Sequence, residues 1–184
     1  MNSILELDGR LSARLRVAEK PGLVRSLSVF LAHSGDSWFW GAALIIIWIL
    51  GRTFWKQWAI IILAAISVLA ALVMGLKFII RRRRPEGEWG GIYRNTDPHS
   101  FPSGHAARAF LIAVLATGLG PAGLAVALWI WAPLVSLARV AMGVHYVSDV
   151  VAGFAVGILM GVAAWQIHGT FLHWLASLTS FPLW

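Results

Sequence analysis

Residues 58–80 read WAIIILAAISVLAALVMGLKFII, an apolar run in which Lys77 is the only charged residue. A helix needs about 20 predominantly apolar residues to cross the hydrocarbon core of a bilayer, and this run is long enough to do so. The rest of the chain agrees, because 59% of its 184 residues are hydrophobic and only 12% are charged. Soluble proteins carry about twice that share of charge. We therefore expect an all-α integral membrane protein.

Four other stretches also have the length and polarity of membrane spans. The five expected spans are Trp38 to about Trp55, Trp58–Ile80, Pro102–Leu119, Ala122–Met142 and Tyr146–Ile167. Short links at residues 118–121 and 143–144 predict that the last three spans pack as antiparallel neighbours. The expected architecture is a polytopic helix bundle that forms one domain over residues 1–184, with a transmembrane core at 38–167 and an interfacial tail at 168–184.

The N-terminal part of the chain is expected to lie on the membrane surface. Residues 4–17 place leucines on one side of a helix and Arg10 and Arg14 on another, which is typical of a basic amphipathic interfacial helix. Leu23–His33 is apolar but only 11 residues long. We interpret it as a second interfacial or half-inserted helix within residues 1–37. If it crossed the bilayer, the number of spans would rise from five to six.

The formal net charge of +7 limits the partners of the chain. Because its basic residues flank the apolar spans, we expect an anionic lipid headgroup in the bilayer as partner and exclude nucleic acid. The absence of cysteine excludes disulfides and thiolate chemistry. By the positive-inside rule, the basic residues between positions 10 and 25 place the N-terminus of this multi-pass protein in the cytoplasm. Five crossings then place the end of Trp58–Ile80 on the cytoplasmic face of the cell membrane as well.

Three short polar blocks interrupt the apolar pattern, and tracing the direction of the spans brings all three to one face of the membrane. They are Lys77 with Arg84-Pro85, then Pro102-Ser103-Gly104-His105, then Arg139 with His145 and Asp149. Ionisable groups are costly to bury in or near hydrocarbon, so those at the ends of spans are candidates for function.

The first block supplies two cations. Lys77 and Arg84 are seven residues apart, nearly two turns, so on a continuous helix they would share one face and could hold one anion. The neighbouring residues Arg81–Arg83 are interpreted as charges that reach the membrane surface and set the topology.

The second block opens the third span. A helix N-terminus offers unpaired amide donors and the positive end of the helix dipole to a phosphate, and Gly104 permits close approach of the backbone. The alternative is an ordinary helix cap with His105 facing solvent. Arg108 lies three residues beyond His105 and on the same face, so it either reaches the membrane surface or contacts substrate.

The third block contains a potential nucleophile. His145 and Asp149 are four residues apart, so the carboxylate could hold one imidazole nitrogen and leave the other as a nucleophilic lone pair. A hydrogen-bonded helical pair without chemistry is the alternative. Arg139 lies inside the fourth span, where a cation requires an anion. Only 8 residues are acidic and no second carboxylate is near, so we predict no metal site.

Together, these spacings closely resemble the signature of the type 2 phosphatidic acid phosphatase family. The family's first block, Lys, six residues, Arg-Pro, matches residues 77–85, and its second, Pro-Ser-Gly-His, matches residues 102–105 in full. Its third, Ser-Arg, five residues, His, three residues, Asp, matches residues 139–149, whereas the leading Ser is Ala138 here. The departure affects a supporting hydrogen bond and none of the reacting groups.

The resemblance implies a mechanism without metal or cofactor. His145 would attack phosphorus to give a phosphohistidine that water hydrolyses, Asp149 would orient His145, and His105 would protonate the leaving oxygen. The groups implied to hold the phosphate oxygens are Lys77, Arg84, Arg139 and the amides around Ser103 and Gly104.

Three functions are compatible with this pattern. The first is a lipid phosphatase that acts on isoprenoid phosphates or diphosphates, phosphatidate or phosphatidylglycerophosphate. The second is a transferase that passes the phospho-headgroup to an alcohol with the same His-Asp machinery. The third is a non-catalytic protein that binds or translocates lipids.

Glycines recur every four residues along the last span, at Gly153, Gly157 and Gly161. Such a face allows close approach of another helix. Packing within the chain is the favoured interpretation, and a homodimer is the alternative.

Overall fold

The computed structural model describes residues 2–94 and 97–178, and the regular secondary structure in this part of the chain is helical. The helices, in order, are α1 (Asn2–Leu15), α2 (Leu23–Ser34), α3 (Ser37–Leu50), α4 (Thr53–Ile80), α5 (Glu88–Arg94), α6 (Gly104–Leu119), α7 (Ala122–Ala141) and α8 (Val147–Leu178). The predicted all-α class is confirmed.

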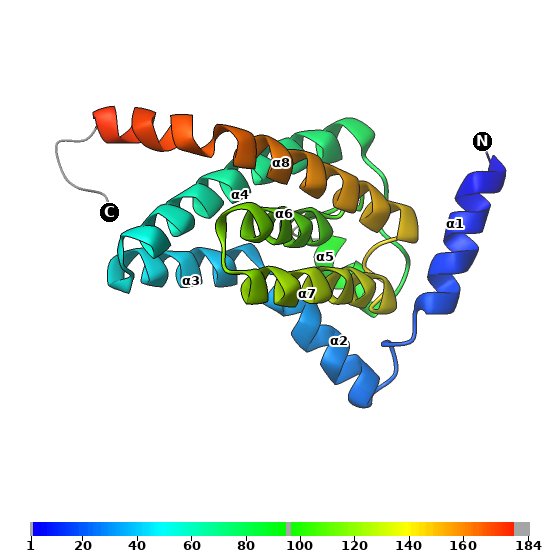
Figure 1. Ribbon diagram of the computed structural model, residues 1–184. Coiled ribbons are helices and arrows are strands. Elements are labelled where there is room, and N and C mark those ends of the chain that lie inside the picture. Colours follow the sequence, from blue (N-terminus) through cyan, green and yellow to red (C-terminus); the bar gives the residue numbers. More distant parts are fainter. Residues whose placement is uncertain (1, 95–96, 179–184) are drawn as a thin grey trace.

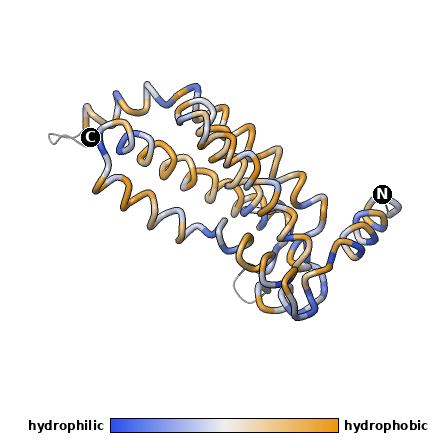
Figure 2. Tube along the Cα trace, turned by 60° about the horizontal axis from the view of Figure 1, so that its bottom comes forward, coloured by the Kyte–Doolittle hydropathy of each residue, from blue (hydrophilic) through white to orange (hydrophobic). Residues whose placement is uncertain are grey.

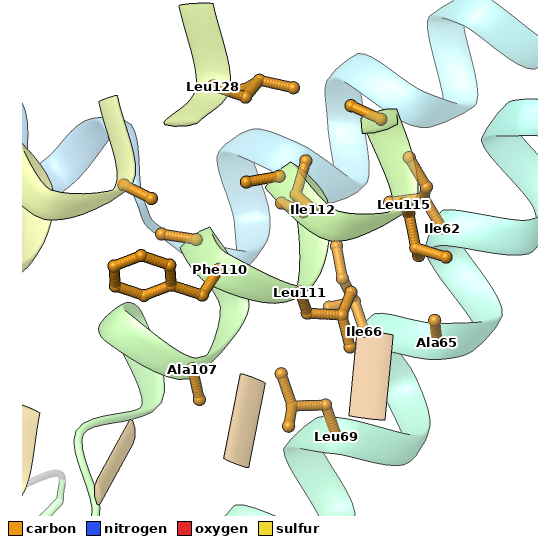
Figure 3. Packing of buried hydrophobic residues seen from close by; sticks show 14 of the residues in the cluster. Ile62, Ala65, Ile66, Leu69, Ala107, Phe110, Leu111, Ile112, Leu115 and Leu128 are labelled. Carbon is orange, nitrogen blue, oxygen red and sulfur yellow. The ribbon is translucent and has the colours of Figure 1, made fainter. Parts of the chain in front are cut away.

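Helix α6 forms the centre of the bundle, with α4, α7 and α8 packed around it (Figure 1). Every residue of α6 from Ala106 to Val114 is buried, which is expected of a helix that is apolar on all sides. Figure 3 shows how Leu111 and Leu115 of α6 lie against Ile62 and Ile66 of α4. This core holds the N-terminus of α6, and with it the second polar block, in a fixed position.

The glycine face of α8 is filled by α6 of the same chain. A Cβ atom on Gly153 would lie 2.5 Å from the carbonyl oxygen of Ser103, and one on Gly157 would lie 2.3 Å from that of Ala107. Only glycine permits this approach. Packing within the chain is therefore confirmed, and this face is not available to a second copy.

The surface of the bundle is apolar, as a lipid environment requires. Helices α4, α7 and α8 are long and apolar enough to cross a membrane, and α3 and α6 are shorter apolar helices. Apolar colour runs along most of their length in Figure 2. Large apolar side chains such as Leu50 and Leu159 are at least 70% exposed, and soluble monomers rarely expose apolar patches of this extent. The protein is a membrane protein.

The first predicted span differs from the structure. Helix α3 ends at Leu50, before the expected end near Trp55, and α4 already begins at Thr53. With 14 residues, α3 is about 21 Å long, too short to cross the hydrocarbon core alone. Helix α2 does not fold back beside α3. It packs on α7, whereas α3 packs on α4, and the two meet at Gly35 and Asp36 (Figure 1).

The helix of the last expected span does not end at Ile167, because α8 continues without a break to Leu178. Gly169 lies inside this helix, where one glycine costs only about 1 kcal/mol, and no proline occurs between Pro133 and Pro182. The predicted interfacial tail is thus helical as far as Leu178, and residues 179–184 lie outside the described residues. The segment between α4 and α6 contains the short helix α5.

Candidate active site

The three polar blocks meet at one end of the bundle, as predicted. They surround a cavity of about 220 Å³. One wall is apolar and belongs entirely to α4, from Ile66 to Met74. The rest of the lining comes from α3, α4, α5, α6, α7 and the loops beside them, and consists of Ser37, Lys77, Tyr93, Asp97, Gly104, His105, Arg108, Arg139 and His145.

Two cations of the first block hold the carboxylate of Asp97. Nη2 of Arg84 donates to Oδ2 of Asp97 at 2.8 Å, and Nζ of Lys77 donates to the same oxygen. The predicted continuous helix through Arg84 is wrong, because Arg81 adopts the left-handed conformation and ends α4 at Ile80. The two cations nevertheless converge on one anion. Asp97 therefore occupies a position suited to a phosphate oxygen.

Arg139 is a fully buried cation that also lines the cavity. Its Nη1 donates to the hydroxyl of Tyr93 at 3.1 Å, and its guanidinium lies 4.6 Å from the centre of the Tyr93 ring. Its exposed fraction is 0%, and Nε has no hydrogen-bond partner among the described residues. In the same part of the chain, no carboxylate lies within ion-pair distance of it. A buried guanidinium with this environment favours an anionic ligand.

His145 has the protonation pattern of a nucleophile. Nη1 of Arg84 lies 3.2 Å from Nε2 of His145. Because a guanidinium can only donate, Nε2 accepts and carries the lone pair. Burial lowers the pKa of His145 well below its ordinary value, and the charges of Arg84, Arg139 and Lys77 lower it further. The imidazole is therefore neutral at neutral pH.

Asp149 lies beside the other nitrogen of His145. Its Oδ2 is 3.5 Å from Nδ1 of His145, longer than a hydrogen bond. The same oxygen accepts the backbone N–H of Tyr146 at 2.9 Å, and Oδ1 accepts from Arg82 at 2.8 Å. The predicted pair is adjacent, but its hydrogen bond is not closed. Catalytic hydrogen bonds are often long without substrate.

The prediction that the Arg82 side chain reaches the membrane surface is wrong. Its Nη2 donates to Asp8 at 2.6 Å, and its Nη1 donates to both Asp149 and Ser148. Asp8 in turn accepts the backbone N–H of Ser148 at 3.0 Å, and the hydroxyl of Ser12 accepts that of Val147. Helix α1 therefore caps the N-terminus of α8 and holds the arginine that binds Asp149. Figure 1 shows α1 beside this end of the bundle.

Ser103 is placed differently from the expectation. It is buried, its backbone N–H donates to the carbonyl oxygen of Asp149 at 2.9 Å, and its hydroxyl caps α6 by accepting from Ala106. Both groups are used within the protein, and Ser103 does not line the cavity. Gly104 and His105 do line it, so the amides expected to face a phosphate begin one residue later.

Ala138, which replaces the expected serine, belongs to an apolar cluster beneath the site. It is 3% exposed and packs with Ala18, Ala32 and Met142. A hydroxyl group there would need its own hydrogen-bond partner to avoid a desolvation cost. The alanine suits an apolar contact between α7 and the N-terminal segments.

A family model described as the PAP2 superfamily matches residues 58–172, more than half of the chain. The chain belongs to the PAP2 superfamily. The resemblance carried by the three polar blocks is thus confirmed, and all three lie within the matched residues.

Several proteins are similar to this PAP2 chain. An undecaprenyl-diphosphatase of Sulfolobus acidocaldarius is 31% identical over 159 residues, which cover 80% of this chain and 72% of the relative. A decaprenylphosphoryl-5-phosphoribose phosphatase of Mycobacterium tuberculosis is 32% identical over 160 residues, which cover 83% of this chain and 85% of the relative.

Two solved structures share the fold of this PAP2 chain. A PAP2-type phosphatidylglycerolphosphate phosphatase of Bacillus subtilis has a TM-score of 0.73 and 23% identity, with coverage of 99% of this chain and 90% of the other. LpxE of Aquifex aeolicus has a TM-score of 0.68 and 27% identity, with coverage of 88% of this chain and 94% of the other.

Four charged residues at or beside the site of this PAP2 chain were not assigned to it from the sequence, namely Asp8, Asp36, Arg82 and Asp97, and neither were the cavity-lining residues Ser37 and Tyr93. The four charged residues lie outside the three blocks, and each contacts a partner far away in the sequence, 74 residues away for Arg82 and Asp8. The three aspartates could have been noticed in the sequence, because the chain has only 8 acidic residues. Within residues 2–94 and 97–178, no three His, Asp or Glu side chains are grouped so that they could hold a metal ion.

Proposed function

We propose that this protein hydrolyses phosphate esters of membrane lipids through a phosphohistidine on His145. That the chain is a phosphatase follows from its family and from its named relatives. The lipid substrate and the covalent intermediate are the proposal. The observation that carries it is the cavity at the end of an apolar bundle, where Lys77, Arg84 and Arg139 surround a neutral His145.

The chemistry requires two steps. In the first, the lone pair on Nε2 of His145 attacks phosphorus, the bond from phosphorus to the lipid oxygen breaks, and His105 gives that oxygen a proton. In the second, water attacks phosphorus, the bond from phosphorus to Nε2 of His145 breaks, His105 takes up a proton from that water, and inorganic phosphate leaves. The three cations stabilise the charge on the phosphoryl oxygens in both transition states, which is the main task in phosphoryl transfer.

The apolar wall of the cavity supports a lipid alcohol as leaving group. Ile66, Leu69 and Val73 of α4 continue from Lys77 toward the middle of the bundle, so a lipid with its phosphate at Lys77 could lay its first carbons along α4. We propose isoprenoid phosphates or diphosphates as the substrate class, because the names of two relatives refer to such lipids. Phosphatidate and phosphatidylglycerophosphate are the competing substrates.

Phosphate release by the purified protein tests this proposal. Wild-type protein in detergent should release inorganic phosphate from an isoprenyl monophosphate in excess chelator, and His145→Ala should release none. Transfer of the phosphoryl group to an added alcohol in place of water would identify a transferase. A protein that only binds or translocates lipids would release no phosphate at all. Strict dependence on a divalent metal would contradict the proposed chemistry.

We further propose five membrane crossings, with the first formed by α2 and α3 together. In this proposal the two helices form one broken passage from the site end of the bundle to its far end, and the packing of α2 on α7 and of α3 on α4 supports it. The N-terminus and the active site then share the cytoplasmic face, where most basic residues lie. Glu86→Cys is a suitable probe, because Glu86 is exposed and the chain has no native cysteine. An impermeant thiol reagent should label it only in opened cells, and labelling in intact cells would contradict this orientation.

A further inference from the structure

The break between α2 and α3 lies against the first turn of α6, and this contact involves the proposed general acid. Oδ1 of Asp36 lies 2.7 Å from Nε2 of His105. Arg108 of α6 donates to the carbonyl oxygen of Gly35, and a Cβ atom on Gly35 would lie 2.9 Å from Val135. The backbone at the break is thus held close to both α6 and α7, and it places the Asp36 carboxylate at His105.

Asp36 does not perform the structural task that its position suggests. It is the N-cap residue of α3, where an aspartate usually accepts a backbone N–H of the first turn, yet its side chain makes no such bond. Its two oxygens are divided between different partners. Oδ2 binds the nearby residues His33 at 2.9 Å and Trp38 at 3.2 Å, whereas Oδ1 is left for His105 alone.

We infer that Asp36 is a positioning residue for the acid His105, and that the two form a second His-Asp pair opposite His145 and Asp149. This inference rests on the proposed function. With Nε2 of His105 held by the carboxylate, Nδ1 is the nitrogen that can carry the transferable proton. When the bond from phosphorus to the lipid oxygen breaks, its electron pair stays on that oxygen, and the proton on Nδ1 neutralises it.

Charge in the cavity explains why the acid needs this partner. Arg108 and Arg139 line the same cavity as His105, and their guanidinium groups disfavour a third positive charge on the imidazole. The Asp36 carboxylate offsets this repulsion and stabilises the imidazolium form. Both side chains are mostly buried, with 17% of His105 and 16% of Asp36 exposed, so water screens the interaction only weakly.

The inference predicts a dependence on the leaving group. An alkoxide leaves only if it receives a proton, whereas 4-nitrophenolate leaves without one. Asp36→Asn keeps the size of the side chain and removes its charge. It should lower kcat on dodecyl phosphate by about 100-fold, the scale of general acid catalysis, and kcat on 4-nitrophenyl phosphate by less than about tenfold. A lipid diphosphate, whose leaving group is a phosphate, should show an intermediate loss.

Four further variants complete the test. His105→Ala should show the same selectivity, and the double variant Asp36→Asn with His105→Ala should be no worse than His105→Ala alone. His33→Ala is the matched control, because it removes a contact of the other oxygen of Asp36, and it should keep nearly full activity on both substrates. Asp36→Glu restores the charge and should recover part of the lost rate on dodecyl phosphate. Such a recovery would show that the loss in Asp36→Asn comes from the missing charge and not from a folding defect.

Equal losses on the two substrates, or additive losses in the double variant, would overturn the role of Asp36. Failure of the proposed function gives a different result, namely no phosphate release by wild-type protein or full activity of His145→Ala. The two failures are therefore distinguishable in one set of measurements.

Discussion

Asp97→Asn should strengthen the binding of phosphate. In the ligand-free protein, the Asp97 carboxylate pairs with both Lys77 and Arg84, the cations proposed to hold the substrate. A phosphate that enters must displace the carboxylate from them. Neutral asparagine keeps the shape of the side chain but competes much less with phosphate for the two cations.

The size of the effect follows from the exposure of the two ion pairs. The Asp97 side chain is 31% exposed, whereas those of Lys77 and Arg84 are 5% and 1% exposed, so each pair is worth about 1 kcal/mol, the upper end of the range for exposed pairs. Breaking two such pairs costs roughly 1–2 kcal/mol, and removal of this cost corresponds to about tenfold tighter phosphate binding. Because a substrate phosphate meets the same cations, KM for a lipid monophosphate should fall in parallel.

The assay is product inhibition by inorganic phosphate, measured for wild type and Asp97→Asn at one pH and ionic strength. Glu86→Gln is the matched control, because it removes the same charge from an exposed position in the segment between α4 and α6 and should leave inhibition unchanged. An unchanged or weaker inhibition in Asp97→Asn would refute the reasoning, since it would mean that Asp97 supports the cations and does not compete with the ligand.

Three other perturbations have defined outcomes. Gly157→Ala places a Cβ atom 2.3 Å from a backbone oxygen of α6 and should lower the free energy of unfolding by about 1–3 kcal/mol. Gly169→Ala in the same helix meets nothing within 4 Å and should not lower it. Thermal unfolding in detergent compares the two variants. The acid limb of the pH profile of kcat/KM should lie below about pH 6.5. Burial lowers the pKa of His145, so the imidazole loses its nucleophilic lone pair only when it is protonated at lower pH. An acid limb above that pH would contradict a neutral nucleophile. Asp8→Asn should lower kcat about tenfold with little change in KM, since it removes a charged hydrogen-bond partner of Arg82 worth roughly 1.5 kcal/mol, and an unaltered kcat would show that α1 does not support Asp149.

The membrane fold and the meeting of the polar blocks could be predicted because both depend on local properties of the chain. An apolar run of sufficient length indicates a span wherever it occurs, and the direction of successive spans places Lys77, His105 and His145 at one end. Helix ends were harder to predict. The left-handed Arg81 ended α4 before Arg84, and α8 passed beyond Ile167 because no proline stops it.

The supporting charges could not be predicted, for a different physical reason. Asp36, Asp97 and Arg82 lie in a helix break or in loops, where no periodicity assigns a side chain to a face. Their partners come from other helices and become neighbours only after the bundle has packed. Arg82 also looked like its neighbours in a run of four arginines, and only the fold distinguishes it as the one that bridges Asp8 and Asp149.

The most direct test of the central claim is a search for the phosphorylated enzyme. Wild-type protein is mixed with a radiolabelled lipid monophosphate, quenched within one turnover, and digested so that the labelled residue is identified by mass spectrometry. We predict an acid-labile, base-stable phosphoryl group on His145, which decays as inorganic phosphate appears and is absent from His145→Ala. Turnover without label on His145, or label on another residue, would contradict the mechanism.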